Sequence, residues 1–238
     1  MNTVHIVRGI RGLMGIKERQ ERDREAVRRA ILDAARDLFV SEGFQNVSIR
    51  KIAERIEYSP GALYGYFPSK DDIFFALAEE GFRLLGDPSA RVETASTPLE
   101  RLRASFRHFY QFSCDHPQYF TLMFVDQSVP RISREYERFA FAREKKRQVV
   151  QLIQACIDSG DLPATLDPAV AFRTFSVGLI GVAVTRLSDR LQPGESADDL
   201  ATDVLNVTLA GLRSGVALRS KSSVDCPPQE QPADVKAS

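Results

Sequence analysis

The residues between positions 48 and 70, SIRKIAERIEYSPGALYGYFPSK, have the types and spacing that could bind a nucleic acid. Hydroxyl groups, lysine and helix N-termini bind phosphate oxygens and position a protein on DNA, whereas other side chains read the base edges. Small residues let a helix approach the groove closely. The candidates for phosphate contacts are Ser48, Tyr64, Tyr66 and Lys70, and the candidates for base contacts are Arg50, Tyr58, Ser59, Pro60, Gly61 and Ala62.

Helix signals indicate how the chain would position these residues. Ser48 is an N-cap signal for a helix with an apolar face, and Ser59 followed by Pro60 is the start signal of the next helix. Upstream, apolar residues recur at spacings of three and four over residues 27–39, and Gly43 is typical of a helix C-terminus. Two helices joined by a tight turn predict a helix-turn-helix with its second helix in a DNA major groove. The tyrosines of this motif could alternatively be core residues.

The remaining patterns predict an all-α fold. Ser69 and Asp72 resemble a capping box that opens a fourth helix, and further helical patterns occupy residues 97–114, 117–125, 131–159, 167–191 and 196–218. We therefore expect an N-terminal three-helix DNA-binding domain and a larger C-terminal helical domain for ligand binding and dimerisation. The expected segments are a flexible basic arm (1–21), the DNA-binding domain (22–67), the larger domain (68–218, with a bridging helix at 69–86) and a disordered tail (219–238).

Composition limits the possible partners and compartments. Lys and Arg together number 32, as do Asp and Glu, so binding to nucleic acid must depend on local charge. Residues 1–66 hold twelve Lys or Arg against nine Asp or Glu. Three widely spaced cysteines form no disulfide framework or zinc pattern, and the apolar run at 176–184 is too short to span a bilayer. We expect a cytoplasmic protein without a membrane partner.

The run from Ile31 through Lys70 resembles the DNA-binding domain of the TetR/AcrR transcriptional regulators. The matching elements are ILDAARDLFVSEGF, VSIRKIAERI and SPGALYGYFPSKDDIF, and the resemblance covers about the first 85 residues. It implies that Tyr64 and Lys70 contact backbone phosphates, while Ser48, Arg50 and residues 59–62 face the groove. It also implies an effector pocket in the larger domain and a dimer formed by the last two long helices.

One position departs from the pattern of this family. The turn between the two helices of the motif usually carries glycine, and here the residue is Glu57. A glutamate with positive φ would be strained, so either the turn has a different shape or the strain is tolerated. Its negative charge would also oppose the DNA phosphates.

Aromatic residues concentrate between positions 106 and 141, where the resemblance implies the effector pocket. A cavity lined by aromatic side chains with a few polar groups suits a small apolar or amphipathic molecule. Ordinary helix-bundle core is the alternative for each residue. Cys114 and His116, with His108 upstream, lack the number and spacing of ligands for a metal site, so we expect no metal or cofactor. The expected effector-binding residues are Phe109, Phe112, His116, Phe120, Met123, Phe124, Phe141 and Phe175.

The helices expected at 167–191 and 196–218 are the most apolar of the chain. Their apolar width exceeds what one buried face needs, which favours a homodimer interface, although burial within one subunit is the alternative. The expected interface residues are Phe172, Leu179, Val182, Leu187, Leu205 and Leu212.

Together these features predict a ligand-responsive transcriptional regulator and not an enzyme. We expect a homodimeric repressor that binds a palindromic double-stranded DNA operator and is released by a small-molecule effector. No catalytic constellation is visible. The alternative is a helical carrier of hydrophobic ligands, or an enzyme, without DNA-binding activity. The basic residues of the arm could add contacts to DNA, and they are Arg8, Arg11, Lys17 and Arg19. The acidic residues near them in the sequence favour a solvated segment instead.

Overall fold

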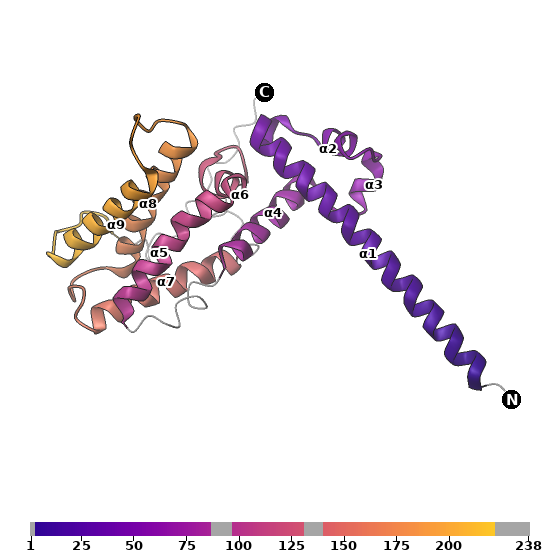
Figure 1. The fold of residues 1–238 in the computed structure, drawn as a ribbon, viewed down its shortest axis with the longest axis horizontal. Coiled ribbons are helices and arrows are strands. Elements are labelled where there is room, and N and C mark those ends of the chain that lie inside the picture. Colours follow the sequence, from indigo (N-terminus) through magenta and orange to yellow (C-terminus); the bar gives the residue numbers. More distant parts are fainter. Residues whose placement is uncertain (1–2, 87–96, 131–139, 222–238) are drawn as a thin grey trace, which may run out of the picture. The chain divides into compact units, whose positions relative to one another are not determined.

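The computed structural model describes residues 3–86, 97–130 and 140–221, and within these ranges every regular element is a helix. The all-α prediction is confirmed (Figure 1). The predicted tail lies outside the described residues from position 222 onward. The elements are α1 (Thr3–Glu42), η1 (Phe44–Asn46), α2 (Ile49–Arg55), α3 (Pro60–Tyr64), α4 (Lys70–Leu85), α5 (Pro98–Asp115), α6 (Pro117–Phe120), η2 (Thr121–Val125), α7 (Ala140–Asp158), α8 (Pro168–Leu187) and α9 (Ala197–Arg213).

Helix α1 begins much earlier than the sequence patterns suggest. We expected an irregular basic arm over residues 1–21, but the helix already runs from Thr3. The physical reason is local: residues 17–29 contain no Gly or Pro, and ion pairs such as Arg28–Glu25 at 3.7 Å connect successive turns. A helix nucleated by the packed part of α1 can therefore extend outward at low cost. The side chains of Arg8 and Arg11 lie outside the described residues.

The chain divides into two compact units, which differ from the expected domains. The first unit comprises residues 1–86 and 112–143, and the second comprises residues 87–111 and 144–238. Helix α4 belongs to the first unit because its apolar face, including Ile73, Phe74 and Leu77, is buried. The helix expected to bridge two domains is thus part of the core that supports the helix-turn-helix.

Aromatic packing in the first unit holds the short helices in place. The Phe44 ring lies 5.0 Å from the Phe39 ring and 5.8 Å from the Phe74 ring, each in an edge-on arrangement. Ile52 of α2 and Leu63 of α3 are fully buried. Each such side chain contributes about 1.5–3 kcal/mol of burial free energy, so α3 is held by its apolar side chain despite its five residues.

Helices α8 and α9 pack closely in the second unit. A Cβ atom on Gly178 would lie 2.7 Å from a methyl carbon of Val204, so glycine is needed where the two helices touch. Asp167 caps α8 by accepting hydrogen bonds from the backbone N–H groups of Ala169 and Val170. Helix α8 also packs on α5, where the Phe106 ring stacks on that of Phe175 at 4.5 Å, while Val177 on α8 and Val207 on α9 stay exposed.

Candidate nucleic-acid interface

Three serine side chains cap the helices around the expected interface. The hydroxyl oxygens of Ser48 and Ser59 accept hydrogen bonds from the N–H groups of Lys51 and Ala62, both at 3.2 Å. Ser69 caps α4 in the same way. All three predicted N-caps are confirmed. The hydroxyls of Ser48 and Ser59 act only as acceptors within their caps, so their hydrogens remain available to donate, as a phosphate contact requires. The Ser69 hydroxyl also donates to the carboxylate of Asp72 at 2.7 Å.

The turn between α2 and α3 keeps the geometry that usually needs glycine. Glu57 has a φ of 60°, its N–H donates to the carbonyl of Glu54, and the N–H of Tyr58 donates to the carbonyl of Ala53. These two hydrogen bonds form a Schellman motif with glutamate in the left-handed position. Of the two possibilities considered for this turn, the structure therefore supports tolerated strain over a different shape.

Replacing Glu57 with glycine is expected to raise the free energy of unfolding by about 0.5–1 kcal/mol. A non-glycine residue in this region costs about 1–2 kcal/mol, and the greater freedom of glycine in the unfolded chain offsets part of the gain. Thermal unfolding measures the change. Glu57→Gln is the matched control, because it removes the charge but keeps the strained backbone. Equal stabilisation by both variants would contradict the conformational explanation.

Helix α3 presents its remaining side chains to solvent. Leu63 is buried, whereas the adjacent Tyr64 is 56% exposed, and the ring of Tyr58 is exposed as well. Pro60 and Gly61 are also exposed, so nothing bulky covers the start of the helix. The core interpretation of Tyr64 is therefore wrong. The expected base-reading residues from Tyr58 to Ala62 lie on the turn and the start of α3, whereas Arg50 lies on α2.

The two basic candidates differ in their surroundings. Arg50 forms an exposed ion pair with Glu54 at 2.9 Å, which is weak and can be exchanged for a phosphate. Lys70 is already engaged: its Nζ donates to the carbonyl oxygen of Phe44 at 2.7 Å and lies 4.2 Å from that ring centroid. In this structure Lys70 therefore ties the start of α4 to η1. Its ammonium has three donors, so a phosphate contact stays a prediction.

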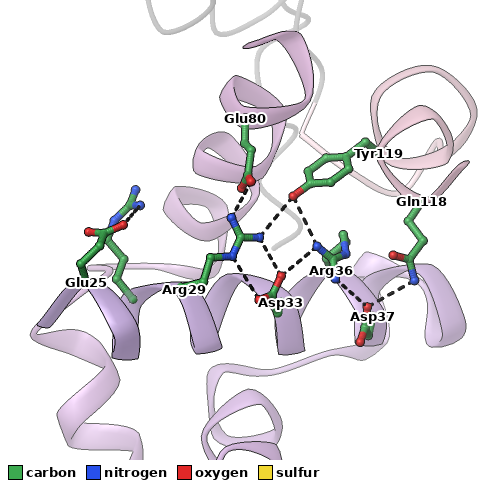
Figure 2. A network of polar contacts seen from close by, with 9 residues as sticks. Glu25, Arg29, Asp33, Arg36, Asp37, Glu80, Gln118 and Tyr119 are labelled. Atoms are coloured by element: carbon green, nitrogen blue, oxygen red, sulfur yellow. Dashed lines mark hydrogen bonds and ion pairs between the residues drawn. The ribbon is translucent and has the colours of Figure 1, made fainter. Parts of the chain in front are cut away.

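A polar network behind this surface was not expected from the sequence (Figure 2). Arg29 of α1 donates to Glu80 of α4 at 2.5 Å and to Asp33 at 2.6 Å. Arg36 donates to Asp33 at 2.8 Å, and both arginines reach the hydroxyl of Tyr119, on α6, at 3.4 Å. The network thus joins α1, α4 and α6 within the first unit.

The hydrogen bonds between Arg29 and Asp33 stabilise the charged forms of both side chains. The bond to Arg29, opposed in part by burial, lowers the pKa of Asp33, and the bond to Asp33 raises the pKa of Arg29. Arg29 and Asp33 therefore both keep their charges at neutral pH. The spacing of Arg29, Asp33 and Arg36 along α1 is a visible signal in the sequence. Their partners on α4 and α6 carry no such signal.

The expected effector-binding residues fall into both units. In the first unit, the Phe120 ring lies 5.1 Å from that of Phe124 and 6.5 Å from that of Phe112. Met123 packs against α4. His116 and Phe141 belong to the same unit, whereas Phe109 and Phe175 belong to the second. A cavity of about 600 Å³ in the second unit is lined by residues of 163–170 and 212–221, and by none of the eight. The effector site stays a prediction.

The expected dimer interface needs a correction. Leu179 and Val182 of α8 and Leu205 and Leu212 of α9 are already buried within one chain, on helices that pack against each other at Gly178 and Val204. Phe172 and Leu187 are half-buried. The apolar residues that do face solvent lie elsewhere on the same helices: Val177 is 62% exposed and Val207 is 71% exposed.

Helix α8 is apolar over a longer stretch than the run at residues 176–184. Among the described helices it is the one long and apolar enough to cross a membrane by length and composition, with a mean hydropathy of 1.5 over 18 residues. The apolar run at 176–184 was expected to be too short to span a bilayer, but the whole helix meets that length and composition. A core helix of a globular protein has the same composition, and α8 packs one of its faces on α9.

Two family models match the chain. The model described as "Bacterial regulatory proteins, tetR family" matches residues 31–77, and the one described as "Tetracyclin repressor-like, C-terminal domain" matches residues 102–208. The first covers the C-terminal part of α1, all of α2 and α3, and the first half of α4. The second covers the described helices from α5 through most of α9.

Similar proteins include several transcriptional repressors. The HTH-type transcriptional repressor KstR of Rhodococcus jostii is 39% identical over 77 residues, which are 32% of this chain and 35% of the relative. KstR2 of Mycolicibacterium smegmatis, also a repressor, is 25% identical over 152 residues, 60% of this chain and 71% of the relative. The structure of the ketosteroid transcriptional regulator KstR2 of Mycobacterium tuberculosis has the same fold, with a TM-score of 0.59 and 22% identity, over 78% of this chain and 94% of that one.

Proposed function

Since the chain belongs to the TetR family of bacterial transcriptional regulators, we propose that it is a cytoplasmic repressor that binds a palindromic operator as a homodimer and is released by an apolar or amphipathic effector. The observation that carries this proposal is the exposed surface of α3. Helix α3, anchored by buried Leu63, presents Gly61 and Tyr64 to solvent. The N-cap residues Ser48 and Ser59 lie at the starts of α2 and α3. Such a helix can enter a major groove without a steric barrier.

The division of contacts follows from exposure and chemistry. Ser48, Tyr64 and Tyr66 supply hydroxyl groups for backbone phosphates, with Lys70 as a further cation. Base edges are read from the start of α3, from the turn before it and from Arg50 on α2. Glu57 lies in that turn and places a carboxylate beside the DNA, so it lowers affinity without defining the site. The base-reading residues are Arg50, Tyr58, Ser59, Pro60, Gly61 and Ala62.

The dimer forms through the outer faces of α8 and α9. Val177 and Gly181 on α8, with Val207 and Ala210 on α9, are exposed and uncharged. Helix α8 packs on α9 and, through Phe172 and Phe175, on Phe106 of α5, but Val177 and Gly181 remain exposed, so a second copy of the chain is the natural cover for this remaining face. Twofold symmetry then presents two α3 helices to half-sites about 34–36 Å apart.

The effector acts on the first unit through its aromatic cluster. The rings of Phe112, Phe120 and Phe124 form this cluster, and Met123 beside them contacts α4 at Gly81. Tyr119, which lies on α6 with Phe120, reaches Arg29 and Arg36 of α1. A ligand that displaces α6 or α4 changes these contacts and moves α1 with its attached reading helix. The ligand needs only to bind the DNA-incompetent state more tightly.

Selection of operator DNA tests the proposal. Purified protein is incubated with fragments of its own genome, and retained fragments are examined by gel shift over a range of salt concentrations. We expect a sequence-specific complex at about 150 mM salt whose affinity falls steeply with added salt. An apolar ligand should weaken this complex. Absence of any specific complex would contradict the proposal and favour the hydrophobic-ligand carrier or enzyme.

A further inference from the structure

An arginine outside the helix-turn-helix lies against its far end. The guanidinium of Arg24, on α1, lies 5.8 Å from the centroid of the Tyr66 ring, two residues beyond α3. Figure 1 shows α3 beside the middle of α1, with the N-terminal part of α1 continuing past it. Arg24 precedes the segment that matches the family model, which begins at residue 31.

The guanidinium of Arg24 is free to bind an anion. Within the described part of the chain it has no hydrogen-bond or ion-pair partner, and its residue is exposed. Its neighbours on α1 differ. Arg28, which lies over the Phe67 ring, pairs with Glu25 at 3.7 Å, and Arg22 donates to the carbonyl of Glu18 at 3.3 Å.

The surroundings of Arg24 form a shallow, open groove. Its lining residues come from α1 and from the segment that follows α3: Gln20, Asp23, Arg24, Val27, Gly65 and Tyr66. A guanidinium attracted to the face of an aromatic ring keeps its N–H groups available, and these can bind two oxygens of one phosphate. The attraction to the ring also limits the side-chain freedom that binding would otherwise remove.

We propose that Arg24, held by Tyr66, is a phosphate-binding residue that extends the DNA contact beyond the helix-turn-helix. The inference rests on the proposed function, since it needs a specific DNA complex. Arg24 contributes to affinity and salt dependence but not to base preference, because phosphates carry no sequence information. Tyr66 acts mainly as the support that positions the guanidinium.

Operator titrations with Arg24 variants test this proposal. Arg24→Ala removes one phosphate contact in each half-site, so it should weaken binding to the selected operator about 5–10-fold at about 150 mM salt and reduce the salt slope by about two, equally for related sequences. Arg24→Lys should be intermediate, because it restores the charge but not the planar fork. Tyr66→Phe removes the hydroxyl proposed to contact a phosphate but keeps the ring, and Tyr66→Leu removes both. With Arg24 still present, Tyr66→Leu should weaken binding clearly more than Tyr66→Phe.

Arg22→Ala is the matched control, since Arg22 lies two residues away and therefore points about 200° around the helix. It should bind like the wild type. Equal affinities and salt slopes for Arg24→Ala and Arg22→Ala would overturn the inference while leaving the proposed function intact. A changed base preference in Arg24→Ala would also overturn it. A wild-type protein that forms no specific complex would instead overturn the proposed function and the inference together.

Discussion

Replacing Val207 with aspartate is expected to convert the protein to a monomer and to lower its operator affinity by at least about a hundredfold. Val207 is the most exposed large apolar residue described on α8 and α9. In a twofold interface one substitution places two carboxylates in an apolar contact, where neither has a cation. Loss of the dimer removes the gain from linked half-sites, which is on the order of a hundredfold or more.

Sedimentation velocity measures the oligomeric state, and gel shift measures the affinity. Val177→Asp, on α8, should behave like Val207→Asp. Thr202→Asp is the matched control, because it adds the same charge at an exposed position of α9 outside this face. A dimeric Val207→Asp protein, or equal dissociation in the Thr202 variant, would show that another surface forms the dimer.

Replacing Gly81 with alanine is expected to lower the free energy of unfolding by about 1–3 kcal/mol. The added Cβ would lie 2.3 Å from the sulfur of Met123, on η2, and 3.2 Å from the Tyr119 ring, on α6, so both side chains would have to shift away from α4. Glycine to alanine inside an unobstructed helix gives the opposite result, a gain of up to about 1 kcal/mol. The sign of the change in the free energy of unfolding therefore shows whether Met123 and Tyr119 crowd Gly81.

Two further variants separate crowding from helix propensity in the Gly81 experiment. Gly15→Ala, on α1, meets no atom within 4 Å and should not destabilise the protein. Met123→Ala opens the space that the new methyl group would occupy. The double variant Gly81→Ala/Met123→Ala should therefore be more stable than the sum of the two single changes predicts. Additive changes in denaturant unfolding would contradict the proposed crowding.

The local parts of this structure were predictable from the sequence because their signals are local. Ser48, Ser59 and Ser69 cap the predicted helices, since a side-chain oxygen three residues before a free N–H is sufficient for the cap. The strain at Glu57 was foreseen for the same reason. The ordered motif, and with it the family, depended on these short-range signals.

Features that depend on tertiary packing were not predictable. An apolar stripe shows that a helix face is covered but not which element covers it, so Leu179 and Leu205 were assigned to the dimer instead of to the contact between α8 and α9. In the same way, the sequence did not reveal that Glu80 and Tyr119 would meet Arg29. Partners separated by tens of residues leave no periodic signal in a single chain.

Hydroxyl-radical footprinting of the selected operator tests most directly whether two α3 helices read DNA as a symmetric pair. We predict two protected patches related by twofold symmetry, with centres about 34–36 Å apart along the duplex. Val207→Asp protein at the same concentration should protect neither patch. A single patch that persists with the Val207 variant, or no protection at concentrations that saturate the gel shift, would contradict the proposed mode of binding.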